Sequence, residues 1–434
     1  MRIIHSRAAG IDIGSKQMFV AINGQPVKVF DTFTEDLEAL ADYLVGHQIA
    51  TVAMEATGVY WTVLYSILDS RGLDVWLVDG KETKQVPGRK TDVKDCSWIL
   101  QLHSYGLLRR CFVPEEYVQE LRSYQRLRED HIRSSSMHIN HMHKALVGMN
   151  IRLPEVLSQV HGASGMKMIK AILDGQRDPE TLLSLCNATI RKNKGEEVLK
   201  ALKGHYSKSG LFALRQAVDA YTFYQQQIHA CDQQIQELLE KIKLDDDDQM
   251  DQNDTVPSRK PIRHNAPNVK DLGKHLLRIF GGKDANALPG ITDYTWLQLL
   301  SEVGDDLGRW KTEKHFTSWL GLAPGQNQSG KRNKRARFKG KPKAGQLFRV
   351  IAQSLILSKS IALGAFGRRL RARKGPRVAI KAVARKLAEL YWRFMVKGAD
   401  YVEKGVAAYE EKLLLQKQKT LTRLAKELDM KVSY

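Results

Sequence analysis

Four carboxylates in the first hundred residues have types and positions suited to metal chemistry. Asp12 and Glu55 each lie in a short apolar segment, and Asp92 and Asp95 stand three residues apart. Residues three apart on a helix share a face, and neighbouring strands of one sheet can bring two strand ends together. Carboxylate oxygens are hard ligands for magnesium, and two such ions can stabilise the attacking and leaving oxygens of a phosphodiester. The four acids therefore predict a two-ion magnesium site, although each one alone could be a surface residue, a helix cap or an ion-pair partner.

An alternation of short strands and helices is expected to position these acids. Hydrophobic periodicity predicts strands over residues 8–12, 18–22, 49–54 and 75–78, and helices over 37–44, 61–70 and 92–102. Such alternation is typical of an α/β sheet. A long helix is then expected from Pro114 towards Met149. The first domain is therefore predicted to be α/β and to span residues 1–155.

The remainder of the chain is predicted to be mostly helical. Apolar residues between Leu214 and Ile242 recur every seven positions, which favours a self-associating coiled coil in a helical region 156–243, although a helix packed on its own chain fits as well. The run LDDDDQMDQNDTVPSRKP is too charged to pack, so residues 244–280 are expected to be an acidic flexible linker and lead-in. We expect a mostly α-helical C-terminal domain to follow over 281–400, and a helical tail over 401–434. Within this domain LPGITDYTWLQLLSEVG is similar to a phosphate-contacting helix-hairpin-helix, or is a plain turn between helices.

The composition indicates a polyanionic partner. Lys and Arg number 68 against 48 Asp and Glu, a net charge of +20 over 434 residues. Such an excess attracts nucleic acid. A run of 18 apolar residues, a signal peptide and a lipidation motif are all missing from the sequence, so we expect no membrane partner and a cytoplasmic location.

A serine in a basic segment is a candidate nucleophile. Ser329 lies in GQNQSGKRNKR, and a second basic patch lies further along the chain at Arg368, Arg369, Arg371 and Arg373. The basic residues expected to bind nucleic acid are those of this patch together with Lys90, Lys331, Arg332, Lys334, Arg335 and Arg337. A hydroxyl needs a base, a cation or a metal to attack at neutral pH, and nearby cations stabilise charge on the phosphate. The same segment would also suit a loop that only binds phosphate.

Several motifs resemble one family of mobile-element enzymes. GIDIGSK around Asp12, AMEATGVYW around Glu55 and GRKTDVKDC around Asp92 and Asp95 resemble the RuvC-like, DEDD-type domain of insertion-sequence family one-ten, in its eleven-eleven subgroup. These proteins are the bridge-RNA-guided transposases, or recombinases. LPGI, GRWKTEKHFTSWLGLAPGQNQSGKRNKR and ARKLAELYW are similar to that family's C-terminal transposase domain.

The resemblance implies a fold, an activity and partners. The first domain would be RNase H-like, and the enzyme would cut and rejoin donor and target DNA while Ser329 becomes covalently joined to the cut end. A guide RNA would supply specificity by base pairing, and the protein would act as a dimer or tetramer near a bacterial nucleoid. Members of the family carry two glycines after the serine, whereas this chain has Gly330 and then Lys331, so Ser318 stays a second candidate.

Three other functions fit part of the sequence. A junction-resolving nuclease would use the same acids with water as nucleophile. A sugar-kinase-like or actin-like ATPase is suggested by IDIGSK, which is similar to the phosphate-facing hairpin of that superfamily. A non-catalytic nucleic-acid binder would account for the charge alone. A protein covalently attached to DNA separates the transposase from the nuclease.

Overall fold

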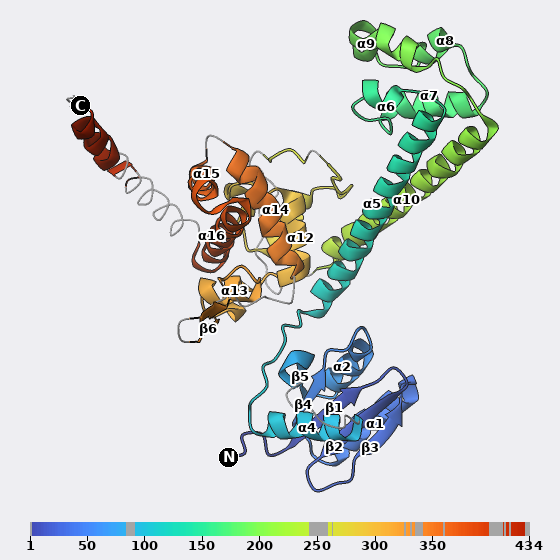
Figure 1. The fold of residues 1–434 in the computed structure, drawn as a ribbon. Coiled ribbons are helices and arrows are strands. Elements are labelled where there is room, and N and C mark those ends of the chain that lie inside the picture. The colour runs from blue at the N-terminus through green and yellow to red at the C-terminus, as the bar shows by residue number, and fades with distance from the viewer. Residues whose placement is uncertain are drawn as a thin grey trace. The chain divides into compact units, whose positions relative to one another are not determined.

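The computed structural model describes most of the chain in two compact units, Met1–Pro114 and Glu115–Tyr434 (Figure 1). The described residues are 2–83, 92–242, 259–262, 264–324, 327–329, 332–334, 342–358, 361–398, 411, 414–415 and 418–429. Over these ranges no single helix is long and apolar enough to cross a membrane. Helices Lys343–Leu357 and Ala362–Lys374 reach the required length and apolar composition only when they are taken together as a bent pair.

A five-stranded mixed sheet forms the centre of the first unit. Its strands are β1 (Ala8–Ile13), β2 (Gln17–Ile22), β3 (Lys28–Asp31), β4 (Thr51–Glu55) and β5 (Asp74–Val78), in the order β3-β2-β1-β4-β5. β2 is antiparallel to β1 and β3, whereas β4 is parallel to both β1 and β5. The α/β prediction is confirmed. β3 was not predicted, because in this edge strand only Phe30 is buried and the apolar alternation is too short to detect.

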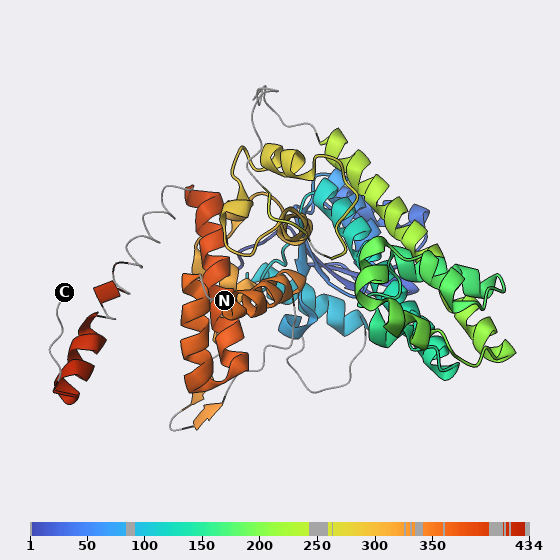
Figure 2. The same ribbon diagram turned by 90° about the horizontal axis from the view of Figure 1, so that it is seen from above.

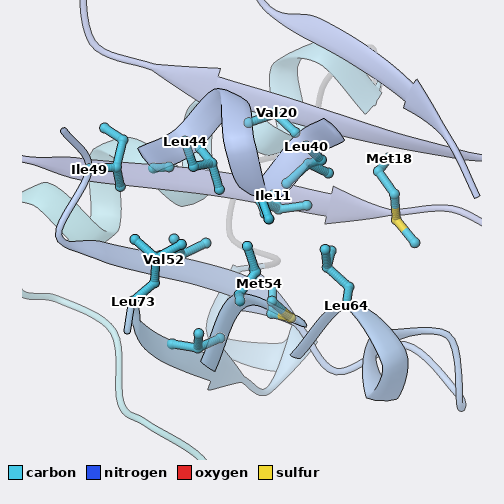
Figure 3. Packing of buried hydrophobic residues seen from close by; sticks show 14 of the residues in the cluster. Ile11, Met18, Val20, Leu40, Leu44, Ile49, Val52, Met54, Leu64 and Leu73 are labelled. Carbon is cyan, nitrogen blue, oxygen red and sulfur yellow. The ribbon is translucent and has the colours of Figure 1, made fainter. Parts of the chain in front are cut away.

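Helices cover both faces of this sheet. α1 (Thr34–Gly46) and α2 (Trp61–Ser70) bury one face, where Figure 3 shows Ile11 and Met54 of the sheet packed with Leu40 and Leu64 of the helices. On the other face Cys96 of α4 (Asp92–Ser104) packs in a separate apolar cluster with β1 and β2 residues. Because successive strand residues point to opposite faces, the residues that follow Ile11 and Met54 belong to the α4 face.

Two long helices organise the second unit. α5 (Glu116–Gly148) packs along α10 (Lys208–Lys241), and α6 (Leu153–Val156), α7 (Ala163–Leu173), α8 (Pro179–Ser184) and α9 (Ala188–Ala201) enclose a core at one end of the pair (Figure 1). Leu214, Ala217, Ile235 and Leu238 of the heptad pattern are buried. The heptad residues of α10 therefore pack within their own chain, which supports the interpretation of an ordinary packed helix over that of a self-associating coiled coil. α5 lies inside the predicted domain 1–155, but the structure groups it with the second unit because it packs on α10.

The C-terminal helices form the rest of the second unit. α11 (Leu272–Ile279), α12 (Asp293–Val303) and α13 (Glu313–Trp319) precede a two-stranded ribbon, β6 (Asn327–Ser329) and β7 (Arg332–Lys334). α14 (Lys343–Leu357), α15 (Ala362–Lys374) and α16 (Pro376–Lys397) follow and pack against one another, as the orange helices of Figure 2 show. Trp296, Phe316, Phe348 and Tyr391 are fully buried at their centre. The prediction of a mostly helical C-terminal half is confirmed.

The end of the predicted acidic linker is a packed part of this domain. Residues 243–258 and 263 lie outside the described residues, but Arg259 Nη1 donates to Asp284 Oδ1 at 2.8 Å. The Lys260 ammonium donates to the carbonyl oxygens of Leu288, at 2.6 Å, and Ile291, at 3.3 Å. Arg259 and Lys260, the last two charged residues of the run that was expected to be too charged to pack, are therefore held by the C-terminal domain, because carboxylates and turn carbonyls withdrawn from water require donors.

A buried arginine ties three segments of the second unit together. Arg128 of α5 is 1% exposed, and its Nε donates to Asp232 Oδ1 of α10 at 2.6 Å. Its Nη1 donates to Tyr294 Oη of α12 at 3.0 Å, and its Nη2 to the Asn265 carbonyl at 3.1 Å. The guanidinium therefore joins the helix pair to the C-terminal helices.

Replacing this arginine should strongly destabilise the second unit. Arg128→Met is expected to lower the free energy of unfolding by about 3–5 kcal/mol, because it leaves the Asp232 carboxylate buried without its cation. Urea unfolding followed by circular dichroism measures the effect. The control is Arg133→Met, whose arginine pairs with Asp130 at the surface with 70% of its side chain exposed, and which should cost at most about 1 kcal/mol. Equal unfolding midpoints for the two variants would contradict the role given to Arg128.

Candidate functional site

Two parallel strands bring Asp12 and Glu55 to the same end of the sheet. The register pairs Ile11 of β1 with Met54 of β4, so Asp12 and Glu55 are the next residues along the two strands. Ile11 and Met54 point into the core under α1 and α2. Asp12 and Glu55, both half-buried, therefore face the α4 side.

Helix α4 runs antiparallel to β1 across that face. Near its end, His103 Nε2 lies 2.9 Å from Thr51 Oγ1 at the start of β4. In its middle the helix backbone approaches Gly10 so closely that a Cβ there would lie 2.3 Å from the Leu100 nitrogen and 2.5 Å from the Cys96 oxygen. Only glycine allows this approach. The first turn of α4 is consequently directed to the sheet end that carries Asp12 and Glu55.

That first turn contains Asp92 and Asp95. Asp92 is the first residue of α4, and its side chain lies outside the described residues, whereas the Asp95 side chain is half-buried. Burial raises the pKa of the neighbouring Cys96 thiol to about 11, and the negative charge of Asp12 contributes to the increase. The Asp12 carboxylate is thus within electrostatic reach of α4.

The donors at this sheet end suit a hard divalent cation, since they are carboxylate oxygens. Among side chains that the structure describes, no group of three or more His, Cys, Asp or Glu is already arranged to hold a metal ion. The fold brings the segments of the four acids to one sheet end, and this is the part of the prediction that the backbone supports.

Sequence reasoning missed the short helix that follows β5. α3 (Gly80–Thr83) places the Thr83 hydroxyl 2.8 Å from Glu55 Oε2, to which it donates. Trp98 Nε1 of α4 donates to the Thr83 carbonyl oxygen at 3.0 Å. Asp79, directly after β5, adds another carboxylate at the same end of the sheet. The polar string DGKET next to a strand end was the available signal.

The candidate serine occupies the tip of the two-stranded ribbon. Ser329 is the last residue of β6 and pairs with Arg332, the first residue of β7, so only Gly330 and Lys331 connect the strands. The structure describes the backbone of the paired residues but not their side chains, and Lys331, Arg335 and Arg337 lie outside the described residues. Ser318, the other candidate, is exposed on α13.

Two cations hold the chain just before this ribbon. Lys381 Nζ of α16 donates to the Ala323 carbonyl oxygen at 3.0 Å, and Arg349 Nη2 of α14 donates to the Gly321 carbonyl oxygen at 3.3 Å. Burial lowers the pKa of Lys381, and the positive charge of Arg349 lowers it further. Helices α14 and α16 therefore anchor the start of the segment that leads to Ser329.

The second basic patch divides into structural and exposed residues. Arg368 Nη1 donates to the carbonyl oxygens of Ile356, at 3.1 Å, and Ser358, at the end of α14. Arg369, Arg371 and Arg373 are exposed on α15. Arg368 therefore binds its own chain, while the other three remain accessible to phosphates. Lys90 lies outside the described residues.

Comparisons with known proteins match both halves of the chain. Residues 9–151 match a transposase model of the DEDD, IS110 type, and residues 284–366 match the transposase IS116/IS110/IS902 family. Together the two matches cover just over half of the 434 residues. No curated protein matches the chain. The first match contains all four candidate carboxylates, and the second contains the ribbon with Ser329.

Proposed function

Because this chain belongs to the IS110 family of transposases, enzymes that act on DNA, we propose that it cuts and rejoins donor and target DNA with magnesium-binding carboxylates and a nucleophilic serine. The DEDD-type domain indicates dependence on a divalent metal. One observation carries the proposal: β1, β4 and the first turn of α4 bring the segments of four acids to one sheet end. The mixed sheet with helices on both faces supports an RNase H-like assignment.

The carboxylates would hold the metal ions. Asp12 and Glu55 would bind from the sheet, and Asp92 and Asp95 from α4. Bound Mg²⁺ ions would neutralise charge on the phosphate and stabilise the attacking and leaving oxygens. Asp12, Glu55 and Asp95 are half-buried, which limits their side-chain freedom before substrate arrives.

The serine would form the covalent link to DNA. Ser329 Oγ loses its proton to a base and attacks the phosphorus, and the bond from phosphorus to one deoxyribose oxygen breaks. That oxygen leaves as a hydroxyl after taking up a proton. The serine ester keeps the bond energy of the phosphodiester, so a sugar hydroxyl can attack it and rejoin DNA without external energy. The basic residues after Ser329 would stabilise the phosphate charge.

A guide RNA would supply sequence specificity. The +20 charge suits two polyanionic partners, and the exposed arginines on α15 would make phosphate contacts that do not read sequence. Base pairing with a bridge RNA would then select the target. Donor and target sites each need strands cut, so we propose that the enzyme acts as a dimer or tetramer.

One experiment tests this function against its alternative. The full chain is incubated with magnesium, its candidate guide RNA and end-labelled donor and target DNA, and products are separated on denaturing gels with and without protease. We expect a DNA-linked protein band that protease removes and a joined DNA product. Metal-dependent cleavage that leaves only free DNA ends would favour a junction-resolving nuclease with water as nucleophile.

The exposed arginines of α15 give a separate prediction. Replacing Arg369, Arg371 and Arg373 with alanine should weaken DNA binding at every sequence and reduce the slope of log K against log salt by roughly 0.9 for each phosphate that is no longer neutralised. Fluorescence anisotropy over a salt series measures both quantities. Arg368→Ala should leave the slope unchanged but lower the unfolding midpoint, because its guanidinium caps α14. An unchanged slope in the triple variant would rule out an interaction of these arginines with phosphates.

A further inference from the structure

We propose that helix α3 sets the position of the Glu55 carboxylate, with Thr83 and Gly80 as positioning residues of the metal site. This inference rests on the proposed function, since it assigns a role to residues behind the candidate ligand. α3 follows β5 directly, and β5 is the parallel neighbour of the strand that ends at Glu55. Thr83 and Gly80 are not themselves candidate metal ligands.

Thr83 restrains one oxygen of the carboxylate. Its side chain is buried, at 9% exposure, and its hydroxyl donates to Glu55 Oε2 at 2.8 Å. The same hydroxyl lies 3.1 Å from the Gly80 carbonyl oxygen, so its own rotamer is confined within α3. Outer hydrogen bonds of this kind orient metal ligands and tune their affinity.

Gly80 makes room for the other oxygen. A Cβ at residue 80 would lie 2.1 Å from Glu55 Oε1 and 2.7 Å from the carboxyl carbon. The Glu55 carboxylate therefore fills the space that any other residue would take with its side chain. Thr83 and Gly80 together confine the carboxylate from two sides.

The restraint extends to the helix that carries the other acids. Trp98 Nε1 donates to the Thr83 carbonyl oxygen at 3.0 Å, and Trp98 lies one turn after Asp95 on α4. α3 thus connects the sheet acid to the helix acids through one residue, whose side chain contacts Glu55 and whose backbone contacts α4. A displacement of α3 would change the spacing between the two sets of ligands.

The chemistry of the donor favours a metal ligand. Among the described residues the hydrogen-bond partner of Glu55 is a neutral hydroxyl. Glu302, in contrast, receives two bonds from the Arg126 guanidinium, at 3.0 and 2.9 Å. A hydroxyl orients a carboxylate without neutralising its charge, so the negative charge is retained for a cation. A guanidinium compensates the charge and makes a structural pair.

Two substitutions at one position separate orientation from packing. Thr83→Val keeps the shape but removes the donor, and Thr83→Ser keeps the donor. Binding of Mn²⁺ to the full chain, followed by electron paramagnetic resonance, gives a midpoint that does not depend on catalysis. We expect Thr83→Val to raise this midpoint roughly 10- to 100-fold and Thr83→Ser to stay near wild type. The magnesium midpoint of DNA cleavage should move in parallel.

A matched control removes the same type of bond elsewhere. Thr181 Oγ1 donates to Asp178 Oδ2 at 2.6 Å at the start of α8. Thr181→Val should therefore leave the metal midpoint unchanged. If Thr83→Val does not fold, Gly80→Ala supplies the same test, because its methyl group must displace the Glu55 carboxylate. We expect Gly80→Ala to raise the midpoint as well.

The outcomes distinguish this inference from the function on which it rests. If Glu55→Gln abolishes metal binding while Thr83→Val and Gly80→Ala bind as the wild type does, α3 is not a positioning element and the metal site stands. If Glu55→Gln and Asp12→Asn both bind metal normally, the proposed site itself is wrong. A midpoint raised equally in Thr83→Ser and Thr83→Val would also overturn the role of the hydroxyl.

Discussion

Asp12→Asn is expected to reduce DNA strand cleavage by on the order of 10³-fold or more. The change removes one negative charge and keeps the side chain's size, so it weakens metal binding at the end of β1 without removing packing. DNA affinity should stay near wild type, because in the proposed function the basic residues make the phosphate contacts. Single-turnover cleavage of labelled donor DNA at saturating magnesium measures the rate.

The control for this variant lies on the same sheet. Asp31 ends β3, is exposed and accepts a bond from Gln17 Nε2 at 3.3 Å. Asp31→Asn removes an equivalent charge from an edge strand and should retain the wild-type cleavage rate. Wild-type cleavage by Asp12→Asn would show that the carboxylate cluster is not the catalytic centre, whereas loss in both variants would indicate a general effect of charge or folding.

Ser329→Ala is expected to abolish the covalent protein–DNA product and lower DNA rejoining by on the order of 10³-fold or more, since the substitution removes the proposed attacking oxygen. Magnesium binding should be unchanged, because the carboxylates lie in a different domain. Denaturing gels with and without protease detect the adduct. Rejoining is followed in the same reactions by the appearance of recombined DNA.

Ser318→Ala is the matched control for the serine. Ser318 is exposed on α13, well before the ribbon tip in sequence, and its loss should leave the adduct intact. An adduct that persists in Ser329→Ala but disappears in Ser318→Ala would identify Ser318 as the nucleophile. Cleavage at the wild-type rate without any adduct in either variant would instead identify water as the nucleophile.

Local patterns in the chain were sufficient for much of the first unit. The helix predicted over 61–70 has the bounds Trp61–Ser70, and the strand and helix that carry Asp12 and Asp92 were both expected. Burial imposes a period of two on strands and 3.6 on helices, so these elements can be identified from nearby residues. The apolar pattern of α10 was equally visible, but periodicity could not say which helix would cover it.

The type and order of the four acids, the basic composition and the family motifs were determined by the sequence alone. The tertiary structure decided that β1 and β4 are parallel and in register, that α4 runs back across them, and that Thr83 reaches Glu55. It also decided that Arg128 pairs with Asp232 and that Arg368, one of the predicted nucleic-acid-binding residues, binds carbonyl oxygens of its own chain. These facts join residues far apart in the chain, and such contacts depend on how complete elements pack, which a local pattern does not encode.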